Sequence, residues 1–303
     1  MAGELVLLTG STGLVGFATL RAALKQGYKI RAAVRSEKKA EIVRSNPTLK
    51  DISEEQLSFV IVPDFLKDGA FDEAVKGVQY ILHVASPVPS PDLTGESDLD
   101  AELVQPAIKG TSGVIQSAHK YGAVKRIVIT SSAAAIVPVS AYGGGDEVWT
   151  PEHRTEPIPS PFFNNVQVAY GTSKTLALKY AEDFVASEKP TFDVIHIHPV
   201  IVLGRDELAL TAKDVDSGSN SYALSVILGK SQSDPFPCVV THIDDVAAAH
   251  VRSLDPKVAG NQSFLLSSTG NEGYTVSNRS MFDTWREWLT DTALVGRSQE
   301  VCG

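Results

Sequence analysis

The sequence predicts an α/β fold, a doubly wound parallel sheet followed by a smaller C-terminal lobe, and two observations carry this prediction. Over the first two thirds of the chain, short apolar runs rich in Val and Ile alternate with helical stretches. These runs are continuously apolar rather than alternating with polar residues, as expected for strands buried on both faces of a sheet. Strand–helix alternation at this spacing is typical of a doubly wound sheet.

The elements follow one another at regular intervals. The expected strands are Leu5–Leu8, Lys29–Val34, Phe59–Val62, Val78–Val84, Arg126–Thr130 and Phe192–Ile197. The expected helices between them are Leu14–Gln26, Glu37–Ser45, Ala70–Lys76, Leu99–Tyr121 and Gln167–Ser187. Beyond residue 200 the pattern weakens, but it still predicts the helix Asp244–Leu254 and the strand Ser263–Ser267.

This order of elements predicts two domains of unequal size. Residues 1–200 form the sheet domain, and residues 237–267 return to it. The smaller lobe, which we expect to hold the substrate, consists of residues 201–236 and 268–303.

Composition excludes several classes of function. The chain has 303 residues and a formal net charge of −9 at pH 7, so its surface repels phosphate backbones and anionic headgroups. We therefore expect neither nucleic acid nor a membrane as a partner. The N-terminus enters a strand directly, without the basic and apolar regions of a signal peptide, which favours a cytoplasmic location. Cys238 and Cys302 lack metal-ligand spacing, so no disulfide framework and no metal site are expected.

A glycine-rich turn follows the first expected strand. Thr9–Gly16 carries Gly10, Gly13 and Gly16 in the spacing GxxGxxG, at the point where a helix begins. The first glycine permits a tight turn, the second lets the backbone approach a pyrophosphate, and the third lets the helix pack on the strand. The free N–H groups of the helix N-terminus then favour phosphate. This pattern predicts a Rossmann-type dinucleotide site, with an ordinary structural turn as the alternative.

The end of the second strand indicates which dinucleotide is bound. An NAD site places an acid there for the ribose hydroxyls, whereas this chain has Arg35, with Lys39 four residues later. An arginine fork suits a phosphate group. We therefore predict NADPH/NADP+ as the cofactor and expect Glu37 to point outward. The alternative is a solvated basic helix start.

A tyrosine and a lysine lie four residues apart on an expected helix. Tyr170 and Lys174 would share one helix face. Moving a tyrosine pKa from about 10 to about 7 takes roughly 4 kcal/mol, and a lysine charge about 4 Å away supplies that order of magnitude. The pair could pass a proton to a carbonyl oxygen. Ser132 follows the fifth expected strand, where ligands bind in open α/β sheets, and could hold the substrate oxygen.

Together these motifs resemble the extended short-chain dehydrogenases/reductases. Within that group the chain is most similar to the dihydroflavonol reductase and cinnamoyl-CoA reductase type, with the fungal methylglyoxal/isovaleraldehyde-type aldehyde and ketone reductases as the closest branch. The resemblance runs from about residue 3 to about residue 273. It rests on Thr9–Gly16, Val34–Lys39, Val62–Asp64, His83–Pro87, Thr130–Ser132, Tyr170–Lys174 and His198–Val200.

The resemblance implies a role for each matching residue. Tyr170 would be the proton donor, Lys174 would bind the nicotinamide ribose and lower the tyrosine pKa, and Ser132 would orient the carbonyl. Arg35 and Lys39 would hold the 2′-phosphate. The cofactor-binding residues that it implies are Gly10, Thr12, Gly13, Leu14, Val15, Gly16, Arg35, Lys39, Asp64 and Phe65 at the adenine, Ala85, Ser86, Tyr170, Lys174, Pro199, Val200 and Val202.

The implied function is an NADPH-dependent oxidoreductase that reduces an aldehyde or ketone of a small molecule, as a monomer or homodimer. Two alternatives stay open. One is an NAD-dependent sugar-nucleotide epimerase or dehydratase, which the basic Arg35 disfavours. The other is an NADP(H)-binding protein with impaired catalysis. The chain departs from the family at Gly204-Arg205, where relatives have Gly-Pro, and over Tyr274–Gly303, so we expect a shortened substrate lobe.

Overall fold

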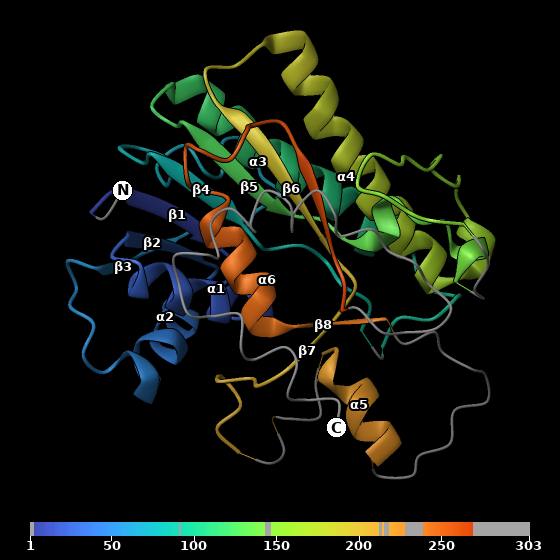
Figure 1. Ribbon diagram of the computed structural model, residues 1–303, viewed down its shortest axis with the longest axis horizontal. Helices are drawn as coiled ribbons and strands as arrows, with labels where there is room; N and C mark the ends of the chain where they lie inside the picture. The colour runs from blue at the N-terminus through green and yellow to red at the C-terminus, as the bar shows by residue number, and fades with distance from the viewer. Residues whose placement is uncertain are drawn as a thin grey trace.

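The computed structural model describes residues 3–90, 92–142, 147–211, 214, 218–227 and 239–268. Seven strands form one parallel sheet in the order β3-β2-β1-β4-β5-β6-β9 (Figure 1). They are β1 (Leu5–Thr9), β2 (Lys29–Val34), β3 (Leu57–Ile61), β4 (Tyr80–His83), β5 (Arg126–Thr130), β6 (Asp193–Pro199) and β9 (Ser263–Leu266). A second parallel pair joins β7 (Ile201–Leu203) and β8 (Val240–His242). The predicted doubly wound sheet is therefore confirmed.

Helices cover both faces of the main sheet (Figure 1). One face carries α1 (Leu14–Lys25), α2 (Glu37–Arg44) and α6 (Ile243–Arg252). The other face carries α3 (Gln105–Tyr121) and α4 (Val166–Glu188), while α5 (Asn220–Ile227) lies beside β7. Short helical turns occupy Pro47–Leu49, Ala133–Ala135, Val139–Ala141 and Phe162–Asn164. Within these described ranges, no helix combines the length and the apolar character that a membrane span requires.

Strand side chains alternate between two core clusters. In β1, Val6 and Leu8 pack with α1 and α6, whereas Leu7 between them packs with α3. All three are fully buried. Burial of a side chain of this kind contributes about 1.5–3 kcal/mol. This burial on both faces is the reason that the strands are continuously apolar in the sequence.

The prediction of a helix at Ala70–Lys76 is wrong. The segment forms a series of turns, in which Asp72 N–H donates to Gly69 O, three residues back rather than four. Arg31 of β2 binds the Ala74 carbonyl at 2.8 Å from outside the segment. A regular helix does not propagate over so few residues when its bonds tighten and its carbonyls are bound elsewhere.

The long helix expected from Leu99 is also modified. A wide turn of π type spans Asp100–Val104 before α3 begins, and Gln105 N–H reaches Asp100 O, five residues back. Pro106 follows directly and has no N–H to donate to an ordinary helical bond, which explains the wider turn. The sequence also gave no sign of β7 or β8, because strands of three residues are too short to show a period.

Several sequence expectations concern residues outside the described part of the chain. They are Cys238, Cys302 and two parts of the expected substrate lobe: residues 212–213, 215–217 and 228–236 of its first segment, and residues 269–303 of its second. The division into two domains stays a prediction. Within the described residues, β9 pairs with β6 in the main sheet, and α6 packs on α1.

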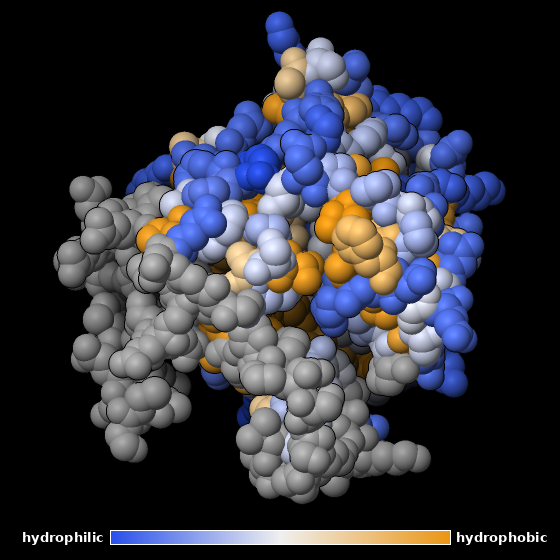
Figure 2. Space-filling model, turned by 90° about the vertical axis from the view of Figure 1, so that its right-hand side faces the viewer, coloured by the Kyte–Doolittle hydropathy of each residue, from blue (hydrophilic) through white to orange (hydrophobic). Residues whose placement is uncertain are grey.

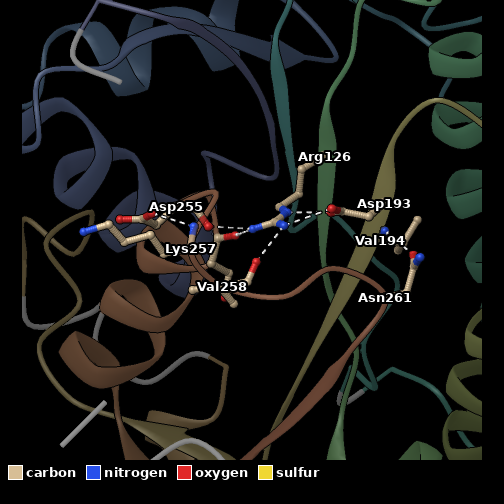
Figure 3. A network of polar contacts seen from close by, with 8 residues as sticks. Arg126, Asp193, Val194, Asp255, Lys257, Val258 and Asn261 are labelled. Atoms are coloured by element: carbon tan, nitrogen blue, oxygen red, sulfur yellow. Dashed lines mark hydrogen bonds and ion pairs between the residues drawn. The ribbon is translucent and has the colours of Figure 1, made fainter. Parts of the chain in front are cut away.

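A buried arginine fastens the amino-terminal end of the sheet (Figure 3). Arg126 opens β5 and donates from Nε and Nη2 to the two carboxylate oxygens of Asp193, at 2.5 and 2.9 Å. Its remaining N–H groups donate to the carbonyls of Ser253, Asp255 and Val258, each at 2.8 Å. The guanidinium thus ties the connection after α6 to β5 and β6.

We predict that Arg126→Met lowers the free energy of unfolding by roughly 3–5 kcal/mol, because it leaves three carbonyls and a carboxylate without their donor. Urea denaturation followed by circular dichroism measures the loss. The matched control is Arg154→Met, whose carboxylate partner Glu182 lies at the surface, where such pairs contribute about 1 kcal/mol or less. Equal losses in the two variants would contradict the prediction.

Candidate active site

The predicted site residues gather at the carboxyl edge of the sheet. All seven strands point the same way, so the loops that follow them meet at this edge. Tyr170 and Lys174 reach the same edge from α4. The loops contribute Gly10–Gly16 after β1, Arg35 and Lys39 after β2, Asp64 and Phe65 after β3, Ala85 and Ser86 after β4, Ser132 after β5, Pro199 and Val200 at the end of β6, and Val202 in β7.

The turn after β1 lies against the backbone after β4. Gly10 has a φ of +83°, and a Cβ there would lie 2.7 Å from Ala85 N. A Cβ on Gly16 would lie 1.9 Å from Gly10 O. Thr9 fixes the contact, because its hydroxyl accepts from Ala85 N–H at 3.1 Å and bonds His83 Nδ1 at 2.9 Å. The first and third glycines are therefore required by packing alone.

The N-terminus of α1 opens at the same place. Gly13 occupies the N-cap position and has no side chain to cover the first N–H groups, which belong to Leu14 and Val15. A Cβ on Gly13 would have only Gly10 O within 4 Å, at 3.7 Å. Free N–H groups and the positive end of the helix dipole favour a phosphate group. The open cradle therefore fits a pyrophosphate.

Two cations stand at the end of β2. Arg35 is exposed and Lys39 is half-buried in the first turn of α2. Ser36 caps this helix by accepting from Lys39 N–H at 3.4 Å. In the described part of the chain, neither cation forms an ion pair. Glu37 is exposed, as expected. Both positive charges are thus available to an anionic group.

The loop after β3 adds an aromatic ring to this end of the edge. Asp64 Oδ1 accepts from Leu66 N–H at 2.8 Å and so closes a tight turn. The half-buried Phe65 packs edge-to-face on Phe71, with ring centres 5.0 Å apart. Asp64 and Phe65 are thereby held side by side.

The three predicted catalytic side chains meet at α4. Asn165 caps this helix by accepting from Gln167 N–H at 2.8 Å. One turn separates Tyr170 from Lys174, whose Nζ lies 5.6 Å from the centre of the tyrosine ring. Ser132 lies close enough to Tyr170 to act on its pKa. Their juxtaposition is therefore present, and their catalytic roles stay a prediction.

The pKa shift of Tyr170 differs in direction from the one expected from the sequence. Burial raises the pKa of Tyr170, and Ser132 offsets the rise only in part. Burial lowers the pKa of Lys174 to about 8. Burial therefore acts on the Tyr170 pKa in the direction opposite to the expected one, and Lys174 is not among the causes of the shift, so the expected effect of Lys174 on this pKa stays a prediction. Tyr170 is protonated at neutral pH and so holds a proton to donate.

Sequence reasoning assigned no role to two neighbours of the predicted catalytic side chains. His198 lies beneath Ser132, and its Nδ1–H donates to the Ser132 carbonyl at 3.2 Å. Tyr222 of α5 lies close enough to raise the pKa of Tyr170 electrostatically. The sequence drew attention to His198 only as part of a motif. It gave no signal for Tyr222, because α5 has no legible periodicity.

A hydrophobic surface lies on the side of the molecule that carries α4 and the short turns Val139–Ala141 and Phe162–Asn164. Figure 2 shows hydrophobic residues gathered near the centre of this face, around a hollow. Phe162 and Phe163 are neighbours in the chain but differ in exposure. Phe163 is 78% exposed, whereas Phe162 is buried with Leu103 in a hydrophobic cluster against which Tyr170 packs. Among the described residues, no group of three or more His, Cys, Asp or Glu could hold a metal ion.

Comparison with known proteins places these features in a family. Residues 6–265 match the model of the NAD dependent epimerase/dehydratase family. The chain is 40% identical over 278 residues to a ketoreductase of Cercospora nicotianae. The matched region spans 90% of this chain and 77% of the ketoreductase.

Solved structures share the fold. The yeast methylglyoxal/isovaleraldehyde reductase Gre2, complexed with NADPH, superposes with a TM-score of 0.80 at 22% identity, over 93% of this chain and 92% of that one. Gre2 of Candida albicans, also complexed with NADPH, gives a TM-score of 0.77 at 28% identity, over 95% and 83% of the two chains.

We predict opposite outcomes for alanine at two glycines of the turn. Gly16→Ala should cost several kcal/mol of folding free energy or prevent folding, since its Cβ would overlap Gly10 O. Gly13→Ala should change stability by about 1 kcal/mol or less, because its φ of −123° is allowed for alanine and its Cβ enters open space. Thermal melts measure both. A Gly16→Ala protein as stable as the unmodified one would contradict the packing described.

Proposed function

The chain belongs to the NAD dependent epimerase/dehydratase family, the extended short-chain dehydrogenases/reductases that its motifs resemble, and from this premise we propose that it is an NADPH-dependent carbonyl reductase. Its substrate would be a ketone or aldehyde, which it reduces to an alcohol. The observation that carries the proposal is the proximity of Ser132 to Tyr170, whose pKa burial raises, at the edge of the sheet where the glycine turn opens.

Ser132, Tyr170 and Lys174 would each have a separate role in the reduction of the carbonyl group. Ser132 would donate a hydrogen bond to that oxygen and so hold the carbonyl beside Tyr170. Tyr170 would transfer its hydroxyl proton to the oxygen as negative charge develops on it. Lys174, one turn below, would stabilise the tyrosinate that remains. NADPH, when bound, supplies the hydride for the carbonyl carbon.

The residues present fit that cofactor. The open N-terminus of α1 would receive the pyrophosphate, and Gly13 would let it come close to the backbone. Arg35 and Lys39 would bind the 2′-phosphate, which NADH lacks. Ala85, Ser86, Pro199, Val200 and Val202 would line the crevice beside the nicotinamide. The similarity to a ketoreductase and to two reductases solved with NADPH supports the proposal.

We predict that Tyr170→Phe abolishes turnover of ketone substrates and leaves the NADPH dissociation constant within about twofold, because only the hydroxyl proton is lost. Steady-state oxidation of NADPH and nicotinamide fluorescence measure the two quantities. Thermal melts establish that the variant is folded. Full activity in this variant would refute the proposed role of Tyr170.

We predict that Arg35→Ala weakens NADPH binding by roughly ten- to a hundredfold, the value of one charge-assisted contact, and leaves NADH binding little changed. Gly13→Ala serves as the contrast, since it should weaken both cofactors through the shared pyrophosphate. Fluorescence titrations with each cofactor measure these effects. Equal losses of NADPH and NADH in Arg35→Ala would mean that Arg35 is structural and that the cofactor preference is set elsewhere.

A further inference from the structure

Three consecutive residues before α4 adopt a left-handed backbone. Phe162, Phe163 and Asn164 have φ angles of +56°, +54° and +52°. Left-handed residues that carry a Cβ are strained, and they ordinarily occur singly rather than in a run. Strain of this kind persists where the surrounding structure imposes it, and it is concentrated at active sites and ligand clamps. The turn Phe162–Asn164 is therefore a candidate for a role in ligand binding.

Contacts on both sides of the turn hold it in this conformation. Asn164 N–H donates to Pro161 O at 2.9 Å, and Asn165 N–H donates to Phe162 O at 3.1 Å. Phe162 is 3% exposed and packs in the hydrophobic cluster beside α4. On the outer side, Asn164 O lies so close to Gly95 that a Cβ on this glycine would be 2.2 Å away. The backbone of the turn is thus fixed from both directions.

The side chain that this turn presents is Phe163. It is 78% exposed, although Phe162 beside it is buried. Its ring therefore adds little to the hydrophobic core, and the core does not account for the strained backbone beneath it. An exposed ring on a rigid turn is a preformed apolar surface, because a ligand that packs on it immobilises little further chain.

The turn lies between two segments that border the predicted active site. Phe162 packs in the same hydrophobic cluster as Tyr170, so the turn adjoins the predicted proton donor. Gly95, on its other side, belongs to the connection after β4, which also carries predicted cofactor contacts. Phe163 precedes the first residue of α4, and α4 begins at the carboxyl edge of the sheet. The ring therefore lies beside the entrance to the crevice.

Neither of these two segments carries a positive charge. Residues 84–99 contain three acids and residues 155–168 contain one, and neither range contains Lys or Arg. An anionic group on a substrate would meet negative charge here and no cation to pair with. A neutral aromatic ring, in contrast, packs on Phe163 in the offset or edge-to-face geometry that aromatic pairs prefer.

We propose that Phe163 is a specificity-determining residue, whose ring packs against a neutral aromatic group attached to the carbonyl that is reduced. This inference rests on the proposed function and narrows its substrates to aryl ketones and aldehydes without an anionic group on the ring. Phe163 acts on binding and takes no part in the transfer of hydride or proton. Its loss should therefore raise KM and leave kcat unchanged.

The first test measures binding and does not depend on turnover. The probe is para-fluoroacetophenone, whose fluorine resonance reports its dissociation constant from the full chain with NADP+ added. In Phe163→Gly we expect this constant to rise about two- to tenfold, which corresponds to one aromatic contact. No binding of the probe to the unmodified chain, or equal constants in the two proteins, would overturn the proposal.

Thermal melts distinguish this role from a structural one. Glycine adopts a φ of +54° without strain, so Phe163→Gly should melt at the temperature of the unmodified chain or above it. Phe162→Ala should melt lower, because it empties a buried position. A matched control is Ile42→Ala on α2, an exposed apolar residue on the opposite face of the sheet, which should leave the dissociation constant of the probe unchanged. A lower melting temperature in Phe163→Gly would mean that the ring supports the fold, against the proposal.

The second test measures turnover with NADPH and separates the two proposals. In Phe163→Gly, KM for para-fluoroacetophenone should rise by the same factor as the dissociation constant, while kcat and the KM for butanone stay unchanged. Para-acetylbenzoate, which carries a carboxylate on the ring, should be the poorer aryl substrate of the unmodified chain. Equal increases in KM for the aryl ketone and for butanone would overturn the role of Phe163. If the unmodified chain binds the probe but reduces neither ketone, the proposed reduction fails, and the binding measurement alone decides the role of Phe163.

Discussion

Parallel pairing of β1 with β4 is the interaction on which the site depends. It brings Thr9 into register with His83, so that their side chains bond and the backbones at Gly10 and Ala85 touch. From this pair the sheet extends in opposite directions, to β2 and β3 on one side and to β5, β6 and β9 on the other. The loops after β1 and β4 diverge, because the chain continues to opposite sides of this pair. In open α/β sheets a ligand crevice forms at such a point, and here it lies between the glycine turn and α4.

Desolvation, rather than paired charge, sets the chemistry of this crevice. Burial raises the pKa of Tyr170 and lowers that of Lys174 to about 8, with no carboxylate among the causes. The histidines around them are held neutral in the same way. A group of uncharged or weakly charged side chains suits the proposed donation of a proton to a neutral carbonyl group. It also makes the site sensitive to small changes in the packing of α4.

The elements that were predicted correctly are those whose residue types are constrained by burial or by backbone conformation within the element itself. Strand bounds such as Lys29–Val34 and Arg126–Thr130 were predicted to the residue, because burial on both faces imposes continuous apolar runs. The glycine turn was recognisable because tight turns and close backbone approach admit few other residues. The predicted helix at Ala70–Lys76 failed, since its carbonyls are bound by an arginine from another strand. No local pattern reports such a contact.

The sequence by itself determined the strands of the sheet, because their apolar runs follow from burial on both faces. It also determined which loops carry the residues of the site, because the spacing of Gly, Tyr and Lys identifies them. Only the tertiary structure decided the protonation of that site. The raised pKa of Tyr170 and the lowered pKa of Lys174 arise from burial among elements far apart in the chain. Burial is a property of the packed whole, and spacing along the sequence does not encode it.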